Sequence, residues 1–453
     1  MRTMISGTKP YFDDLTLVKI FKEEVSIMGR EELISQILAK ISKNEYDALD
    51  EIVLKFPNDI RVLYYSCILF EQQSCKDDNL AEHISFWEKE LENDYAYAAL
   101  LREVDEIEFS GWPTEIAIEI SSCCNAKCRN CTHERLIKSG KRIQEIADKQ
   151  TIFYRIRKIK LLTLLFHSEV GAATPVGLGE PLTHPDIAQI ISYMKVFFPN
   201  VGFNTNAGLL SEKCAQQLIE SGLDYIHLSL SYFDKEIYER EIGLNYDTVI
   251  NNICKFLEIR KQNKDSIKTV CIHIFNNTLN SKEAIENFKD KFRPLLQKND
   301  TLEIRQYMEF GETEAKTKIK KRKDVSPCYQ LWQVLMVDVN GNMYPCCMGV
   351  WKEFDPYLTI GNIQDPIEAV AENLMNLRKK QLEGDMGSCL SCATLRHNYA
   401  FRLPLFCYDK TASIHGNIQY KECTLNTSDL LDIEKRIARY DWRFANETEH
   451  IIE

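Results

Sequence analysis

Residues 115–131 read EIAIEISSCCNAKCRNC, and this stretch decides the fold. Its first part alternates polar and apolar residues, which predicts a β-strand over 115–120. Its second part places Cys124, Cys128 and Cys131 at CxxxCxxC spacing, with Cys123 offering a competing CxxxxCxxC register. Three thiolates on one short loop can hold three irons of a four-iron cluster and leave the fourth iron open to a small molecule. Spacing alone leaves a structural zinc site as the alternative.

Short strand patterns and helical patterns alternate over the next 200 residues or so. This alternation predicts a parallel α/β architecture, open or barrel-like, whose sites gather at the carboxyl ends of the strands. The further strands are expected at 173–177, 201–205, 225–229, 270–275 and 302–307, and the helices at 186–198, 212–221, 246–260 and 282–296.

The strand–helix alternation is confined to this region, and other patterns precede and follow it. Apolar spacing predicts helices over 31–43, 46–56 and 59–72, a pattern that resembles one tetratricopeptide-type pair without a convincing second copy. After 316, Asn340-Gly341 lies between two alternating segments and predicts a type I′ hairpin. Residues 366–382 read as a helix with Pro366 near its start.

Composition limits the class of protein. The chain has 453 residues, 44% of them hydrophobic and 27% charged, which is ordinary for a folded protein. It carries 56 basic and 67 acidic residues, so the net charge of −11 argues against a nucleic-acid binder. No apolar segment is long enough for a signal peptide or a membrane span, so we expect a cytoplasmic protein with reduced thiols and no membrane partner.

Several segments in the expected order resemble those of the radical S-adenosylmethionine (radical SAM) superfamily. The CxxxCxxC loop follows the first strand, and residues 177–181, Gly-Leu-Gly-Glu-Pro, resemble the family's Gly-Gly-Glu-Pro segment, with Leu178 replacing a glycine. Asn204-Thr-Asn206 resembles the Thr-Asn-Gly loop, with Ala207 in the glycine place. Ser229-Leu-Ser231 resembles a Ser-Leu-Asp segment. The resemblance implies S-adenosylmethionine contacts at Gly179, Glu180, Pro181, Asn204, Asn206, Ser229 and Ser231.

A second cysteine group resembles the auxiliary-cluster extension of radical SAM proteins, called SPASM or, in its shorter form, Twitch. Cys328, Cys346, Cys389 and Cys392 would supply four thiolates to one auxiliary 4Fe-4S cluster, with Cys347 as an alternative to Cys346. A further cysteine-rich run after the closing CxxC is missing, so we expect one auxiliary cluster. A four-thiolate zinc site is the alternative here too.

The resemblance implies a partial (β/α)6 radical SAM barrel and a mechanism. A 4Fe-4S cluster at Cys124, Cys128 and Cys131 would reductively cleave S-adenosylmethionine, and the 5′-deoxyadenosyl radical would abstract a hydrogen from a peptide or small-molecule substrate. Oxidative modification, such as crosslinking, epimerisation or dehydrogenation, would follow, with a flavodoxin or ferredoxin as electron donor. The alternative is a non-catalytic zinc or iron–sulfur scaffold that uses its helical domain to bind partners.

We therefore expect four parts along the chain. They are an α-helical domain over 1–110, a radical SAM core over 111–315, a SPASM/Twitch-like domain over 316–400 and a C-terminal tail over 401–453. His227, His273 and Arg305 lie on expected strands and could face the barrel interior as proton-transfer or anion-binding groups. His133, two residues after Cys131, could tune the cluster by a hydrogen bond.

Overall fold

The structure is a computed structural model, and it describes residues 50, 53–74, 112–113, 115–166, 170–263, 267–276, 278–306, 328, 330–351, 354–391 and 449–450. It divides into two compact units, Met1–Glu103 and Val104–Glu453. In the first unit, helix α4 (Ile60–Ser74) confirms the helix expected at 59–72. The helix expected at 31–43 lies outside the described residues.

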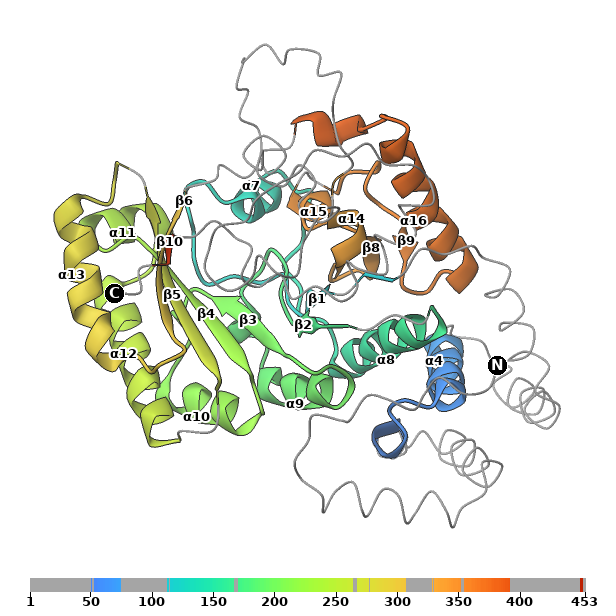
Figure 1. The fold of residues 1–453 in the computed structure, drawn as a ribbon, viewed down its shortest axis with the longest axis horizontal. Coiled ribbons are helices and arrows are strands. Elements are labelled where there is room, and N and C mark those ends of the chain that lie inside the picture. The colour runs from blue at the N-terminus through green and yellow to red at the C-terminus, as the bar shows by residue number, and fades with distance from the viewer. Residues whose placement is uncertain are drawn as a thin grey trace, which may run out of the picture. The chain divides into compact units, whose positions relative to one another are not determined.

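The second unit is built on six parallel strands that follow one another along the chain (Figure 1). Strands β3 to β6 form one sheet, β1 and β2 belong to another, and a single parallel bridge from Ala173 to Val201 joins the two. This arrangement confirms the predicted α/β class. The strands are β1 (Glu115–Ile118), β2 (Ala172–Thr174), β3 (Gly202–Thr205), β4 (Tyr225–Ser231), β5 (Thr269–Asn276) and β6 (Thr301–Gln306).

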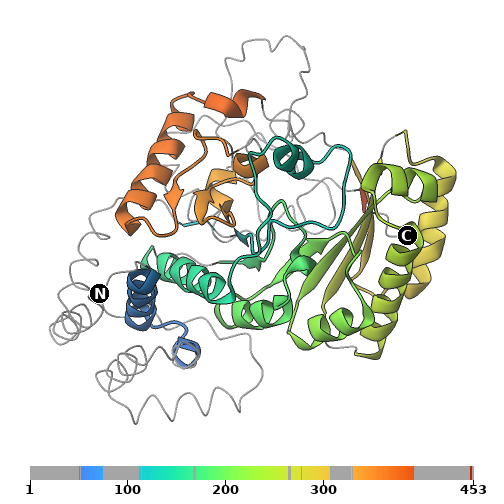
Figure 2. The ribbon, with the colours of Figure 1, turned by 180° about the vertical axis from the view of Figure 1, so that it is seen from behind.

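Helices follow the strands and cover one face of the β3–β6 sheet (Figures 1 and 2). Ser211, Asp234, Asn245 and Ser281 cap four of them, because each side chain accepts a hydrogen bond from a backbone N–H of the first turn. The helices of this region are α7 (Thr132–Lys138), α8 (Lys149–Leu165), η1 (Pro181–Thr183), α9 (Ile187–Phe197), α10 (Glu212–Glu220), α11 (Lys235–Ile242), α12 (Tyr246–Gln262), α13 (Lys282–Phe292) and η2 (Arg293–Leu295).

The segment that carries the second cysteine group continues the sheet of β1. Strand β7 (Val334–Val337) pairs in parallel with β1, so β1 lies between β2 and β7. The antiparallel strands β8 (Asn342–Tyr344) and β9 (Gly361–Asn362) extend the same sheet. The remaining elements are α14 (Gln330–Gln333), α15 (Met348–Trp351), α16 (Ile367–Leu382), η3 (Gly387–Ser391) and β10 (Glu449–His450), which pairs with β6.

The β7–β8 hairpin exists, but the predicted type I′ turn is wrong. That turn needs positive φ at both central residues, and only Gly341 of the Asn340-Gly341 pair has it (φ 88°). Gly341 donates to the carbonyl of Asp338 at 2.9 Å, and the Asp338 carboxylate accepts from the backbone N–H groups of Asn340 and Asn342. A three-residue loop with a left-handed glycine at its end is therefore formed, because the Asp338 side chain stabilises it.

Two further observations concern elements expected from the sequence. Helix α9 begins after Asp186 as expected, but the Asp186 side chain forms no capping hydrogen bond. Its backbone N–H instead donates to Nδ1 of His184 at 3.0 Å. None of the helices in the described part of the chain is long and apolar enough to cross a membrane.

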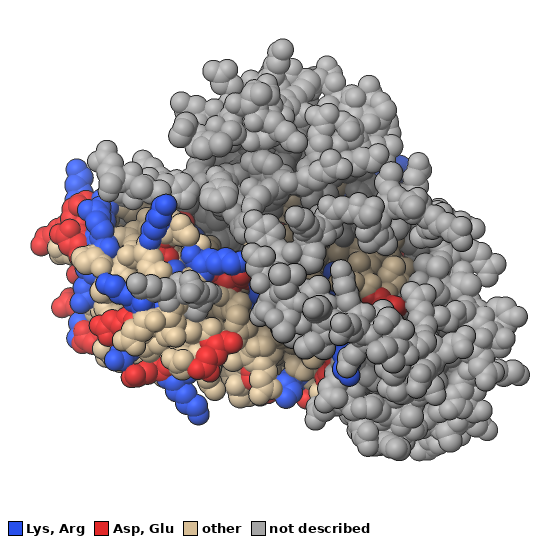
Figure 3. All heavy atoms as spheres, turned by 60° about the horizontal axis from the view of Figure 1, so that its bottom comes forward, with Lys and Arg blue, Asp and Glu red and all other residues tan. Residues whose placement is uncertain are grey.

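Charge is mixed on the surface that can be seen. In Figure 3, the described residues show Lys and Arg interspersed with Asp and Glu, without a continuous patch of one sign on that face. This distribution agrees with the modest net charge of the sequence.

Candidate functional site

The loop between β1 and α7 carries Cys124, Cys128 and Cys131, and electrostatic interactions link their thiols. Burial raises the pKa of Cys124 and of Cys128 to about 12, and Cys131 adds to the increase at both positions. Cys131 is the N-cap residue of α7, and its N–H donates to the carbonyl of Cys128 at 3.1 Å. Cys131 therefore acts on both other thiols of the register that begins at Cys124.

The loop is fixed to the end of helix α11. The N–H of Lys127 donates to the carbonyl of Ile242 at 3.0 Å, and the N–H of Arg129 donates to that of Glu241 at 2.8 Å. Helix α11 ends in Gly243, which has a left-handed φ of 76°, and a Cβ there would lie 3.3 Å from Lys127. A glycine at this position therefore satisfies both the helix end and the close approach of the cysteine loop.

The Gly-Leu-Gly-Glu-Pro segment lies directly against the residues that lead into the cysteine loop. The N–H of Glu180 donates to the carbonyl of Cys123 at 2.7 Å. A Cβ on Gly179 would lie 2.3 Å from the carbonyl oxygen of Ser121, so only glycine fits. The side chain of Leu178, which stands where the family has glycine, packs in a small core with Leu136, Met336, Tyr344 and Val350.

The Glu180 carboxylate ties this segment to the carboxyl end of β3. Its Oε1 accepts from the Thr205 hydroxyl at 2.7 Å, and its Oε2 accepts from the N–H of Asn206 at 2.9 Å. Burial raises the pKa of Glu180, and these hydrogen bonds oppose the increase. Pro181 is the first residue of η1, whose Leu182 N–H also donates to Glu180. Glu180 therefore holds the loop in place with both oxygens.

Asn206 connects the end of β3 to the cysteine loop. Its side-chain amide donates to Oδ1 of Asn125 at 2.9 Å and lies 4.0 Å from Sγ of Cys124. Asn204 lies two residues earlier, in β3. Its side chain is exposed and takes no part in this hydrogen-bond network. Ala207 has a left-handed φ of 58°, which explains why glycine is usual there.

The two serines of β4 lie in different environments. Ser229 is half-buried at the end of the regular part of β4. Ser231 lies beyond a register shift, has a φ of 65°, and its carbonyl accepts from the side chain of Asn280 at 2.9 Å. The backbone of Ser231 therefore forms the irregular end of β4 and is held there by Asn280.

Two glutamine side chains, Gln330 and Gln381, form hydrogen bonds with residues of the second cysteine group. The thiol of Cys346 donates to Oε1 of Gln330 at 3.0 Å. Gln381 accepts from the N–H of Cys328 at 2.9 Å and donates to Sγ of Cys389 at 3.4 Å. The thiols of Cys346 and Cys347 contact each other, and this contact, burial and Cys328 raise the pKa of Cys346. Cys392 lies outside the described residues.

Comparison with known protein families gives two matches in the order that the sequence predicts. Residues 118–290 match the model of the radical SAM superfamily, and residues 328–393 match the SPASM model, an iron–sulfur cluster-binding domain. The chain contains a radical SAM domain followed by a SPASM domain. A radical SAM domain implies a 4Fe-4S cluster and S-adenosylmethionine, and a SPASM domain implies auxiliary iron–sulfur clusters.

The radical SAM domain is similar to curated proteins over part of their length. A probable GTP 3′,8-cyclase of Methanococcus aeolicus is 30% identical over 193 residues, which is 40% of this chain and 57% of that protein. A probable GTP 3′,8-cyclase of Methanococcus maripaludis is 32% identical over 151 residues, covering 31% and 45% of the two chains. The chain thus spans about half the length of these relatives.

Two solved structures are similar to this chain at lower identity. Streptococcus suis SuiB bound to S-adenosylmethionine is 19% identical, with a TM-score of 0.43 over 74% of this chain and 81% of that chain. BtrN in complex with AdoMet and 2-DOIA is 17% identical, with a TM-score of 0.36 over 62% of this chain and 92% of that chain.

Buried polar groups without a partner among the described residues lie near the three-cysteine loop. Within the described ranges, no three His, Cys, Asp or Glu side chains form a group that could hold a single metal ion. The Tyr238 hydroxyl, both ring nitrogens of His133 and two nitrogens of Arg142 are buried without a hydrogen-bond partner in the described structure. Such groups suit a buried acceptor.

A polar cluster lines the face of the β4–β6 sheet opposite the helices, and we name it the lumen cluster: His227, Cys271, His273, Glu303 and Arg305. Strand register places His227 beside Cys271 and His273 beside Glu303, while Ile226, Leu228 and Ile272 are fully buried on the helix side. Arg305 pairs with Glu303 at 2.6 Å and lies 3.2 Å from Nδ1 of His227.

The lumen cluster carries no net charge near neutral pH. Burial, with help from Arg305, lowers the pKa of His227 to about 4, and burial lowers that of His273 as well. Burial alone would raise the pKa of Glu303, but Arg305, together with Cys271 and His227, keeps that pKa below its usual value. The cluster therefore combines one ion pair with two neutral imidazoles.

Sequence reasoning missed Glu119, Arg142, Thr205 and Tyr238. Thr205 lies between Asn204 and Asn206, and the sequence pattern indicated only these two asparagines as ligand contacts. Glu119 completes an alternating pattern and so looks like an exposed strand residue, yet it is fully buried. Arg142 and Tyr238 carry no sequence signal, and only their contacts in the folded chain indicate a role.

Proposed function

We propose that this chain is a radical SAM enzyme whose Cys124, Cys128 and Cys131 hold the 4Fe-4S cluster at which S-adenosylmethionine is reductively cleaved. The observation that carries the proposal is the meeting of these three thiols with the Glu180 and Asn206 loops at the strand ends. The bound cluster and S-adenosylmethionine would supply an electron and a 5′-deoxyadenosyl radical. The radical would abstract a hydrogen from a peptide or small molecule.

The residues of the chain would orient S-adenosylmethionine and the substrate. Gly179, Glu180 and Pro181 form the segment next to the cysteine loop, and the Glu180 carboxylate keeps that segment rigid by bonding to β3. We propose that backbone carbonyls of this segment face the amino group of the ligand. Asn206 and Ser229, at the ends of β3 and β4, would contact its other polar groups.

We further propose that Cys328, Cys346, Cys389 and Cys392 hold one auxiliary 4Fe-4S cluster. Gln381 supports this ligand set, because its one side chain bonds to both Cys328 and Cys389. The resulting cluster would accept or deliver electrons during an oxidative modification, with a small electron-transfer protein as donor.

We propose that the substrate contacts the lumen cluster. The cluster faces the same side of the sheet as Ser229, which pairs with His273. A net charge of zero favours an uncharged polar substrate group over a phosphate. A peptide substrate has support of its own, since a solved structure of SuiB is bound to the precursor peptide SuiA.

The experiment uses full-length protein purified without oxygen and reconstituted with iron and sulfide. We expect about eight irons per chain, and 5′-deoxyadenosine after addition of dithionite and S-adenosylmethionine. Cys124→Ala should abolish 5′-deoxyadenosine and lose about half of the iron. Cys254→Ala is the matched control, because Cys254 lies on α12 away from both groups, and it should behave as the natural chain.

Zinc in place of iron would contradict the proposal. So would well-loaded protein that forms no 5′-deoxyadenosine with peptide or small-molecule candidates present. Either result would favour the scaffold alternative.

A further inference from the structure

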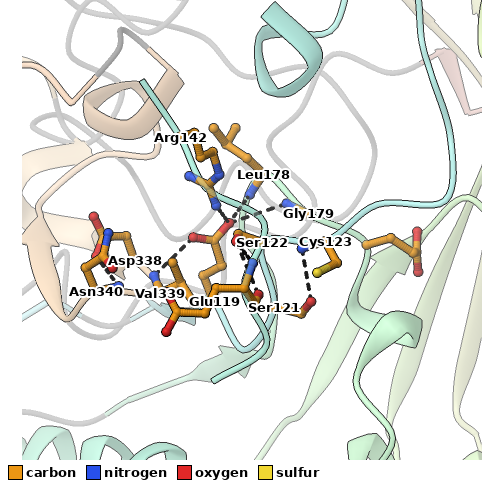
Figure 4. Close-up of polar contacts among 12 residues, drawn as sticks. Glu119, Ser121, Ser122, Cys123, Arg142, Leu178, Gly179, Asp338, Val339 and Asn340 are labelled. Carbon is orange, nitrogen blue, oxygen red and sulfur yellow. Dashed lines mark hydrogen bonds and ion pairs between the residues drawn. The ribbon is translucent and has the colours of Figure 1, made fainter. Parts of the chain in front are cut away.

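A buried ion pair lies where the cysteine loop, the Gly-Leu-Gly-Glu-Pro segment and the β7–β8 hairpin meet (Figure 4). Glu119 follows β1 directly, and its side chain is fully buried. Its Oε1 accepts from Nη2 of Arg142, from the N–H of Leu178 at 2.7 Å and from that of Gly179 at 3.3 Å. Its Oε2 accepts from the N–H of Val339 at 3.1 Å. One carboxylate therefore joins three segments and fixes the guanidinium of Arg142.

The backbone around Arg142 holds it beside the approach to the cysteine loop. Helix α7 begins after Cys131, and the N–H of Arg142 donates to the carbonyl of Leu136 on that helix at 3.3 Å. Ser122 donates through its hydroxyl to the carbonyl of Ile143 at 2.9 Å and through its N–H to that of Glu145 at 2.7 Å. The residues after Arg142 thus run alongside the two serines that precede the cysteines.

The Arg142 side chain keeps hydrogen-bond donors that the described structure does not use. It is 3% exposed, and its guanidinium carbon lies 5.8 Å from the centre of the Phe354 ring. Its Nε and Nη1 have no partner among the described residues, and neither ring nitrogen of the buried His133 has one. A buried donor without a partner destabilises the folded chain, so an acceptor is expected next to it.

The three-cysteine loop is the place where such an acceptor would form. Burial raises the pKa of Cys131, and the charge of Arg142 opposes that increase, so Arg142 acts electrostatically on this thiol. Arg142 also lies near enough to the buried His133, two residues after Cys131, to act on its ring electrostatically.

We propose that Arg142, positioned by Glu119, directs positive charge and N–H donors at the three-cysteine loop and raises the reduction potential of the cluster held there. This inference rests on the proposed function, because it needs a cluster at Cys124, Cys128 and Cys131. A positive charge and hydrogen bonds to sulfur both stabilise the reduced, more negative state of an iron–sulfur cluster. Glu119 limits the effect by partly neutralising Arg142.

The test is a redox titration of the anaerobically reconstituted full chain, followed through the electron paramagnetic resonance signal that S-adenosylmethionine perturbs. At the midpoint potential of the natural chain, Arg142→Gln should lower the ratio of reduced to oxidised cluster by about tenfold. Glu119→Gln should raise this ratio. Arg142→Lys keeps the charge and should stay within about threefold. Lys255→Gln removes a positive charge from helix α12, where the Lys255 side chain is 44% exposed, and should change nothing.

The opposite signs expected for the two partners distinguish tuning from simple damage, since loss of structure would move both variants in the same direction. No shift in Arg142→Gln with full iron content, or a shift of the same sign in both variants, would overturn the inference. If a single variant fails to bind iron, the double variant Glu119→Gln with Arg142→Met removes both charges together. It should lower the ratio less than Arg142→Gln does, and an unchanged ratio would overturn the inference.

Failure of the proposed function would look different. The natural chain would then show no reducible signal that responds to S-adenosylmethionine.

Discussion

At the scale of single residues, Ala207 is where this chain departs from its family at a conformational cost. A left-handed φ costs a residue with a Cβ roughly 1–2 kcal/mol, and glycine avoids the cost. Two effects of the substitution act in the opposite direction. Glycine has more conformational freedom in the unfolded chain, and the buried methyl group is lost. Each lowers the free energy of unfolding by about 0.4–1 kcal/mol. We therefore expect Ala207→Gly to leave the free energy of unfolding nearly unchanged. Ala215→Gly, in helix α10 and equally buried, should lower it by about 1 kcal/mol or more in denaturant titrations. Equal losses in the two variants would contradict this interpretation.

The residues that sequence could predict are those whose chemistry is visible in spacing. Cys131 and Glu180 both act electrostatically on Cys124, and the Asn206 side chain lies 4.0 Å from its sulfur. The roles of these residues stay predictions. Sequence gave no sign that Glu180 would use both carboxylate oxygens within the protein, because Thr205 and Asn206 meet it only after folding.

At the scale of elements, the β7–β8 hairpin depends on one glycine for two separate reasons. Gly341 has a φ of 88°, and a Cβ there would lie 3.0 Å from Ile363. Gly384 has a φ of 92° with open space around it, so it is a matched control. Gly384→Ala should cost about 1 kcal/mol of unfolding free energy from strain alone. Gly341→Ala should cost clearly more, and equal costs in thermal or chemical unfolding would show that crowding adds nothing.

Regular strands were easier to predict than the helices between them. All six core strands were found from short apolar runs, with no end misplaced by more than three residues. Helix α8 was not predicted, because Arg155, Arg157 and Lys158 interrupt its apolar pattern, although all three are buried. The turn type was wrong because Asp338 stabilises a loop that the Asn-Gly pair alone does not indicate.

At the scale of the whole molecule, the SPASM segment and the radical SAM core share the sheet that contains β1. We expect this sheet to open as one unit. Leu335→Ala in β7 should therefore increase hydrogen exchange in β1 and β2 as well as in β7 and β8. Leu228→Ala, equally buried in β4, should increase exchange mainly in β3 to β6. Exchange confined to β7 and β8 in the Leu335 variant, measured by mass spectrometry on the full chain, would show that the SPASM hairpin opens independently.

The position of β1 between β2 and β7 also has a consequence for how the chain is made. The contact between Val339 and Glu119 joins residues 220 positions apart, so the ribosome must synthesise most of the protein before this contact can form. Until then β1 has a free edge, which is a hazard for aggregation, and the cysteines that follow it stand on an incomplete support. We therefore expect the cysteine loop to reach its final, supported arrangement only late in the synthesis of the chain.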